Sequence, residues 1–100
     1  MFSGEDFKRL NRSHFIVLFT SGYHIILRSK CTKHIWDLTC RELFAGKQSI
    51  MVFHKHHSED EFHIQKGFNS LTVVQAQRKI IAHDKWHMEG RGKVSGHRCS

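Results

Sequence analysis

The chain has 100 residues, a length that fits one domain, and Leu, Ile, Val and Phe make up 27 of them. This proportion is enough for a small packed core and excludes a disordered composition. The formal charge is +7, with 16 Lys and Arg against nine Asp and Glu, and the chain has ten His and no Pro. The charge indicates a polyanionic partner such as RNA or DNA, and the absence of Pro excludes Pro-rich linkers and recognition segments.

The first predicted element is a β-hairpin over residues 14–28. Two runs of β-branched and aromatic residues flank Ser21–Gly22, and Gly adopts the positive φ that a two-residue turn requires. One continuous buried helix is the competing interpretation, which Gly22 and the β-branched residues disfavour. In the expected register Leu18 lies opposite Ile25. Both faces of the hairpin are then apolar, and we expect both to be buried.

A helix is predicted over Lys33–Ala45, with Thr32 as its N-cap and Gly46 as its stop. Most of its apolar side chains fall within about half of the circumference of a helical wheel, namely Ile35, Trp36, Cys40, Leu43 and Phe44. Leu38 lies outside this stripe, and the predicted helix leaves it unexplained.

The second half of the chain predicts another hairpin and another helix. Ser49–His57 and Glu61–Lys66 are the strands of the hairpin, and a helix over Leu71–Trp86 follows with Ser70 as its N-cap. A 3-4-3-4 spacing defines one face of this helix, formed by Val73, Ala76, Ile80, His83 and His87. Residues 71–74 taken alone fit a strand equally well.

These elements define an α+β protein with two β-hairpins and one or two helices. We expect a single small domain over residues 1–88. Residues 89–100 contain three Gly and few apolar side chains, which predicts a flexible basic tail.

The densest group of metal-ligating side chains is in the second hairpin. Because side chains alternate along a strand, His54 and His56 share a face while His57 points the other way. A loop over residues 58–61 would place His56 opposite His63, so that His54, His56 and His63 gather on one surface about 5 Å apart. A register slip of one residue would remove His63. The alternative prediction to polyanion binding is therefore a His-rich metal-binding module, with zinc as the candidate ion.

Two smaller groups offer fewer ligands. His83 and His87 stand at i and i+4 of the predicted helix, but their place on its apolar face indicates the rim of an interface. Cys31, His34 and Cys40 are similar to half of a zinc site without the second half, and Cys40 fits a small core residue.

Basic residues near the two ends are the predicted nucleic-acid contacts: Lys8, Arg9, Arg12, Arg91, Lys93 and Arg98. They would neutralise phosphates without reading a base sequence, because the chain has no RNA- or DNA-binding motif. The chain also has no nucleophile elbow and no phosphate-binding loop. We therefore expect a small basic binding protein that is not an enzyme, needs no cofactor and associates with nucleic acid.

The cysteine count and the apolar runs predict the compartment. An odd number of widely spaced cysteines favours reduced thiols. The run Phe15–Phe19 is short for a signal peptide, and Phe15–Leu27 is too short and too polar for a membrane span. We expect an intracellular protein of the cytoplasm or nucleus that does not associate with membranes.

Two further interpretations stay open. The chain is also consistent with the product of an orphan open reading frame without an evolved activity, which would unfold without cooperativity. An apolar hairpin lying on a membrane would instead make solubility depend on detergent.

Overall fold

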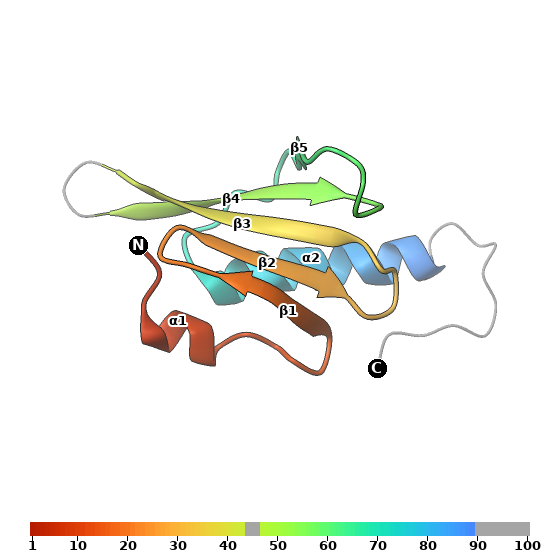
Figure 1. Cartoon of the computed structure of the whole chain (residues 1–100), viewed down its shortest axis with the longest axis horizontal. Coiled ribbons are helices and arrows are strands. Elements are labelled where there is room, and N and C mark those ends of the chain that lie inside the picture. The colour runs from red at the N-terminus through yellow and green to blue at the C-terminus, as the bar shows by residue number, and fades with distance from the viewer. Residues whose placement is uncertain (44–46, 90–100) are drawn as a thin grey trace.

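The computed structural model describes residues 1–43 and 47–89, and these form seven elements. In chain order they are α1 (Gly4–Lys8), β1 (Phe15–Thr20), β2 (His24–Ser29), β3 (Ile35–Glu42), β4 (Gln48–Lys55), β5 (His63–Ile64) and α2 (Val73–Glu89). The strands form one antiparallel sheet in the order β1-β2-β3-β4-β5 (Figure 1), so every strand pairs with its neighbours in sequence. The predicted α+β class is confirmed. The predicted tail lies outside the described residues, except for Glu89, which ends α2.

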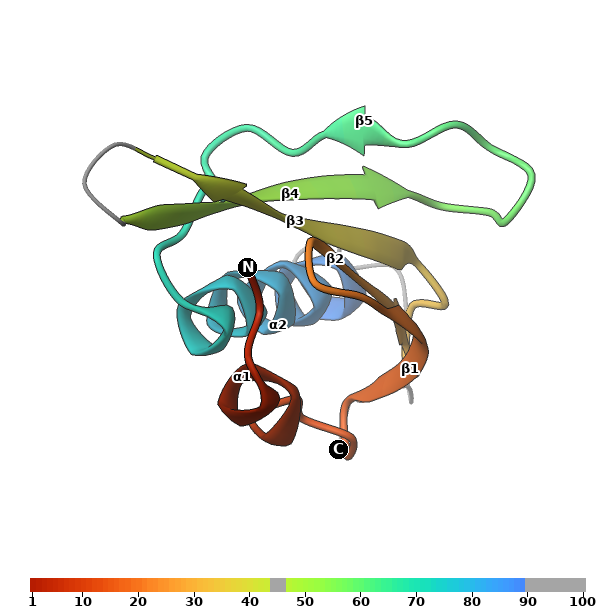
Figure 2. The same cartoon turned by 60° about the vertical axis from the view of Figure 1, so that its left-hand side comes forward.

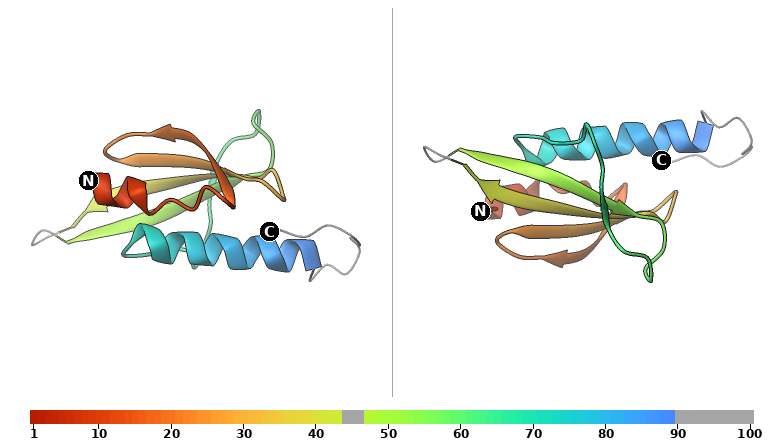
Figure 3. Two further views of the ribbon diagram at one scale, coloured as in Figure 1. Left: turned by 90° about the horizontal axis from the view of Figure 1, so that it is seen from below. Right: turned by 90° about the horizontal axis from the view of Figure 1, so that it is seen from above.

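The sheet has one covered face and one open face. Both helices lie on the same side of it (Figure 2), and α2 runs along its length (Figure 3). Burial alternates along the central strands, with Leu38 of β3 and Val52 of β4 fully buried between more exposed neighbours. Val73, Ala76 and Ile80 of α2 belong to the same core. Alternation with period two is the pattern of strands that bury one face only.

β3 occupies the segment for which a helix was predicted, and that prediction is wrong. All eight of its residues pair with β4, from Ile35 opposite Lys55 to Glu42 opposite Gln48. The side chains of Trp36, Leu38 and Cys40 follow the strand period and face the core. Leu38, which the helix could not explain, is therefore a central core residue.

The first hairpin forms, but its expected register is wrong. β1 and β2 pair with Thr20 opposite Ile25, which leaves four residues between the paired positions, and Ser21 closes this loop by accepting hydrogen bonds from the N–H groups of Tyr23 and His24. A register shift between Val17 and Phe19 bulges the strand. The expectation that both faces of the hairpin are buried is also wrong, because both helices of the described ranges lie on the same side of the sheet (Figure 2) and leave Ile16 on the other face exposed.

The helices begin where side chains cap them. A capping box between Ser3 and Asp6 starts α1, which was not predicted. The predicted helix over residues 71–86 is confirmed as α2, but Thr72 rather than Ser70 accepts the hydrogen bond of a free N–H, that of Gln75. Ser70 instead pairs with Ile50 of β4.

Candidate metal centre

Six of the ten histidines converge at one end of the molecule, between the sheet and the end of α2. They come from the turn before β3, from β4 and the loop after it, from β5, and from the last two turns of α2: His34, His54, His56, His63, His83 and His87. Each ring lies within 6.5 Å, centroid to centroid, of at least one other in this group. We call these six residues the histidine cluster.

The sheet places His54 at the centre of the cluster. His54 follows Ile50 and Val52 on the covered face of β4, so strand alternation turns its ring toward α2. The ring stacks on the indole of Trp36 at a centroid distance of 4.0 Å, and the indole N–H donates to the Ser29 hydroxyl at 3.0 Å. Stacking and burial therefore hold this imidazole in one orientation.

A tight turn brings His34 to the same place. Lys33 adopts a left-handed conformation with φ of 67°, and its N–H donates to the Ser29 carbonyl at 2.9 Å. The His34 N–H donates to the Thr32 hydroxyl at 3.2 Å. The chain thus reverses between β2 and β3 and directs His34 inward.

His34, His54 and His56 form the tightest group. One nitrogen from each ring lies within 4.8 Å of the nitrogens chosen from the other two, and His54 Nε2 is 3.1 Å from His34 Nδ1. When both rings are neutral, one of these two nitrogens carries a hydrogen and donates it to the lone pair of the other. His34 and His54 are 6% and 3% exposed, whereas His56 is exposed to solvent.

Burial keeps the two inner rings uncharged. Removal from water, followed by the proximity of other histidines, lowers the pKa of His34 from 6.5 to about 4 and the pKa of His54 from 6.5 to about 3. Both rings are therefore neutral at pH 7. Neutral imidazole is the form that coordinates a metal ion, because it has a free lone pair.

The spacing of the three rings approaches that of a metal site. With a metal–nitrogen bond of about 2.0–2.1 Å and tetrahedral angles, ligand nitrogens lie about 3.3 Å apart and imidazole centroids about 5 Å apart. The centroids of His34 and His54 are 4.9 Å apart, and those of His54 and His56 are 5.0 Å apart. His34 and His56 stack in parallel at 4.1 Å, so the exposed His56 ring has to tilt out of this stack to coordinate the same ion.

A second group of ligand-type residues is a hydrogen-bonded anchor. The buried Asp84 carboxylate lies 2.7 Å from His14 Nε2 and accepts hydrogen bonds from Ser29 at 2.6 Å and Thr32 at 3.3 Å. Cys31 lies in the same group but is disulfide-bonded, contrary to the reduced state expected from the cysteine count. The carboxylate is already satisfied, and it attaches α2 to the end of β2, to the turn after β2 and to the residue before β1.

The structure brings together two of the three predicted metal ligands and adds a third that the sequence analysis did not select. His54 and His56 belong to the tight group, and His63 packs edge-on against His54 at 5.3 Å without joining the three. The observed register places His54 opposite His63, two residues from the expected pairing. A shift of two residues leaves each side chain on its face, so the predicted grouping partly survives.

His83 and His87, which the sequence places on the apolar face of the predicted helix, both lie in the histidine cluster. In the sequence, the i, i+4 spacing of His83 and His87 indicated that these two could share a ligand. His34 was noted only because it follows Cys31 by three residues. Cys40 of β3 is a buried core residue, as the sequence indicated. Its Sγ lies 3.5 Å from Gln48 Oε1. A helix over residues 33–45, as predicted from the sequence, does not pair with the strand that carries His54. The approach of His34 to His54 and His56 could therefore not be predicted.

Three of the predicted nucleic-acid contacts lie in the described part of the chain, and all three are exposed: Lys8, Arg9 and Arg12. Lys8 forms an ion pair with Glu5 at 3.6 Å, and the backbone carbonyls of Arg9 and Arg12 accept hydrogen bonds from Gln77 and Lys30. The other three contacts lie outside the described residues: Arg91, Lys93 and Arg98.

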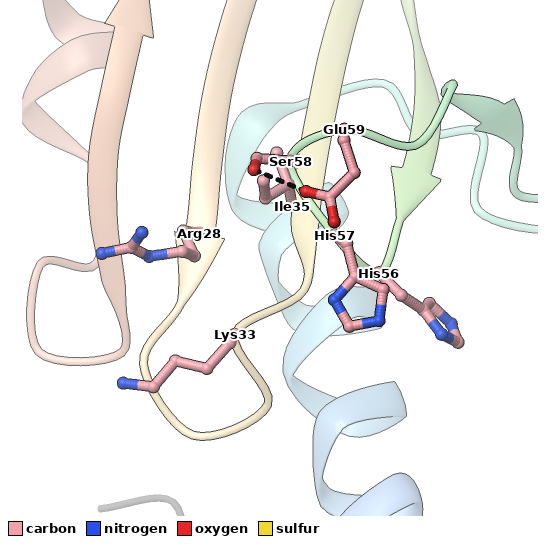
Figure 4. A pocket seen from close by; sticks show the side chains of 7 residues that line it. All are labelled: Arg28, Lys33, Ile35, His56, His57, Ser58 and Glu59. Carbon is pink, nitrogen blue, oxygen red and sulfur yellow. Dashed lines mark hydrogen bonds between the residues drawn. The ribbon is translucent and has the colours of Figure 1, made fainter.

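A hollow of about 350 Å³ lies beside the cluster at the same end of the sheet, and His56 contributes to both. Its lining consists of Arg28, Lys33, Ile35, His56, His57, Ser58 and Glu59 (Figure 4). The His56 side chain points away from Arg28 and Lys33 in this view, and the Ser58 hydroxyl donates to Glu59 at 3.1 Å.

No known protein family, curated protein or solved structure matches this chain. Neither helix in the described ranges is long and apolar enough to cross a membrane.

Proposed function

We propose that the protein is a non-enzymatic metal-binding module that takes up one divalent transition-metal ion, with zinc as the leading candidate, through His34, His54 and His56. The observation that carries this proposal is the meeting of three imidazole nitrogens within 4.8 Å of one another from two separate segments of the chain. Such a meeting depends on the tertiary fold, because 20 residues separate His34 from His54.

The chemistry of the donors supports a borderline metal ion. Imidazole nitrogen binds Zn²⁺, Ni²⁺ and Cu²⁺, whereas Mg²⁺ and Ca²⁺ require oxygen ligands. The lowered pKa of His34 and that of His54 keep both donors unprotonated at neutral pH, so binding there displaces few protons. Trp36 holds the His54 ring in place, which reduces the ordering cost of coordination.

The proposal is tested by titrating Zn²⁺ into metal-free full-length protein in competition with a chromophoric chelator. We expect one ion per chain. His56→Ala is the most informative variant because His56 is exposed, so its loss leaves no cavity. We expect it to weaken binding by at least tenfold.

His57→Ala is the matched control, since His57 is the adjacent exposed histidine and lies outside the histidine cluster. It is expected to bind Zn²⁺ like the unmodified chain. Absence of stoichiometric uptake, or equal losses in the two variants, would refute the proposal.

A further inference from the structure

His87 stands in the last turn of α2 and extends the tight group from the opposite layer of the molecule. Its ring lies 4.8 Å from that of His34, at 66° to it, and 6.5 Å from that of His56, at 70°. The first distance is close to the centroid spacing of about 5 Å that two ligands of one tetrahedral ion require. The second shortens if His56 tilts toward the ion.

We propose that His87 is the fourth ligand of the metal site, so that four imidazoles close its coordination sphere and the ion fastens the end of α2 to the sheet. This inference rests on the proposed metal-binding function and specifies its role. A site with four protein ligands is typical of structural zinc, whereas a catalytic site has three protein ligands and an open position.

The other two histidines of the cluster are worse placed. The His63 ring contacts His54 alone among the three ligands, at 5.3 Å. The His83 ring also contacts only His54 among them, at 5.5 Å, and packs edge-on against Trp36 and Phe68. Among the described residues, His87 is the histidine outside the tight group whose ring contacts two of its members.

The position of His87 along α2 gives this ligand a mechanical consequence. Asp84 already attaches the helix through its hydrogen bonds with His14, Ser29 and Thr32. Residues 85–89 extend beyond that attachment, and Lys85, Trp86 and Glu89 are exposed. An ion held by His87 would attach this last stretch to β4 and to the turn before β3, which hold the other ligands.

Cobalt(II) is the probe that distinguishes a closed site from an open one, because its visible spectrum reports coordination number. The metal-free protein is loaded with one equivalent of Co²⁺ and then titrated with azide. We expect the unmodified chain to show a four-coordinate spectrum that azide leaves unchanged. In His87→Ala, we expect a solvent-filled position that azide occupies with a clear spectral shift.

His83→Ala is the matched control, because it removes a histidine one turn earlier on the same helix. It should retain the azide-insensitive spectrum. Loss of a residue that merely hydrogen-bonds to a metal ligand weakens metal binding by roughly 10- to 100-fold. Because His87 is itself a ligand in this proposal, His87→Ala should weaken Co²⁺ binding by at least that much. Amide exchange of residues 85–89 should slow on metal addition in the unmodified chain and in His83→Ala, but not in His87→Ala.

The outcomes separate this inference from the function on which it rests. If Co²⁺ does not bind the unmodified chain, or binds as well to His56→Ala, the metal-binding proposal fails and this inference fails with it. If Co²⁺ binds and depends on His56, but azide shifts the spectrum of the unmodified chain, or His87→Ala matches His83→Ala, then only the role of His87 is refuted.

Discussion

Acid should destabilise the metal-free protein through the two buried rings of the histidine cluster. The perturbation is a change from pH 8 to pH 5 in the presence of a chelator. A histidine whose folded pKa lies below its unfolded pKa contributes its full stability above the unfolded value, and this stability is lost as the pH falls toward the folded value. Since the pKa is lowered from 6.5 to about 4 for His34 and from 6.5 to about 3 for His54, the loss begins below pH 6.5.

The size of the effect follows from these values. At pH 5 an unfolded histidine is almost fully protonated while either buried ring stays neutral, which costs about 2 kcal/mol for one ring. Because His34 contributes to lowering the pKa of His54, the two costs do not simply add, and the pair together costs between about 2 and 4 kcal/mol. A domain of this size has a stability of roughly 5–10 kcal/mol, so the loss is a large part of the total.

The measurement is urea denaturation followed by far-ultraviolet circular dichroism at both pH values. The double variant His34→Gln, His54→Gln retains polar side chains but cannot take up these protons. We expect its free energy of unfolding to fall by less than that of the unmodified chain over the same interval. A difference below about 1 kcal/mol between pH 8 and pH 5 in the unmodified chain, or an equal fall in the double variant, would show that these rings are not held neutral by the fold.

Three further predictions concern the core, the sheet and the charge. Asp84→Ala should lower the free energy of unfolding by about 3–5 kcal/mol, because it leaves buried hydrogen-bond donors unpaired. Arg78→Ala, at an exposed position on the same helix, should change it by less than about 0.5 kcal/mol. Similar effects in the two variants would exclude the anchoring role of the carboxylate. Leu38→Ala should lower the free energy of unfolding by about 2–5 kcal/mol in the same denaturation assay, and Leu18→Ala should lower it much less. The reason is that Leu38 is fully buried whereas Leu18 is 45% exposed. The reverse order would contradict the strand assignment of β3. Association with RNA or DNA, which the charge of +7 predicts, should be measurable by fluorescence anisotropy at about 50 mM salt and fade by about 200 mM, and affinity that does not change with salt would rule out phosphate contacts.

The type of a secondary-structure element could be predicted from the sequence only where one period, helical or strand, fits its apolar residues clearly better than the other. Residues 71–86 repeat with a helical period over four turns, and α2 forms there. Residues 35–44 fit both a broad helical stripe and strand alternation, because apolar side chains occupy neighbouring positions as well as alternate ones. Only the hydrogen bonds of β2 and β4 on either side select the strand.

The proposed metal site was likewise predictable only in part. Strand alternation correctly placed His54 and His56 on one face, because the period of two is a property of the backbone and survives a register error of two residues. The approach of His34 depends on the turn at Lys33, and the approach of His87 depends on how far along the sheet α2 extends. Neither is encoded in local spacing.

The amino-acid sequence by itself therefore determined the α+β class, the hairpin around Ser21–Gly22, the helix near the end of the chain and the histidine pairs on single elements. These features depend on periods and turn residues that act within a few positions of one another. The tertiary structure alone decided that β3 is a strand and that histidines from the sheet and from α2 meet. Those outcomes depend on pairing and packing between segments that are distant along the chain, where no local pattern carries the information.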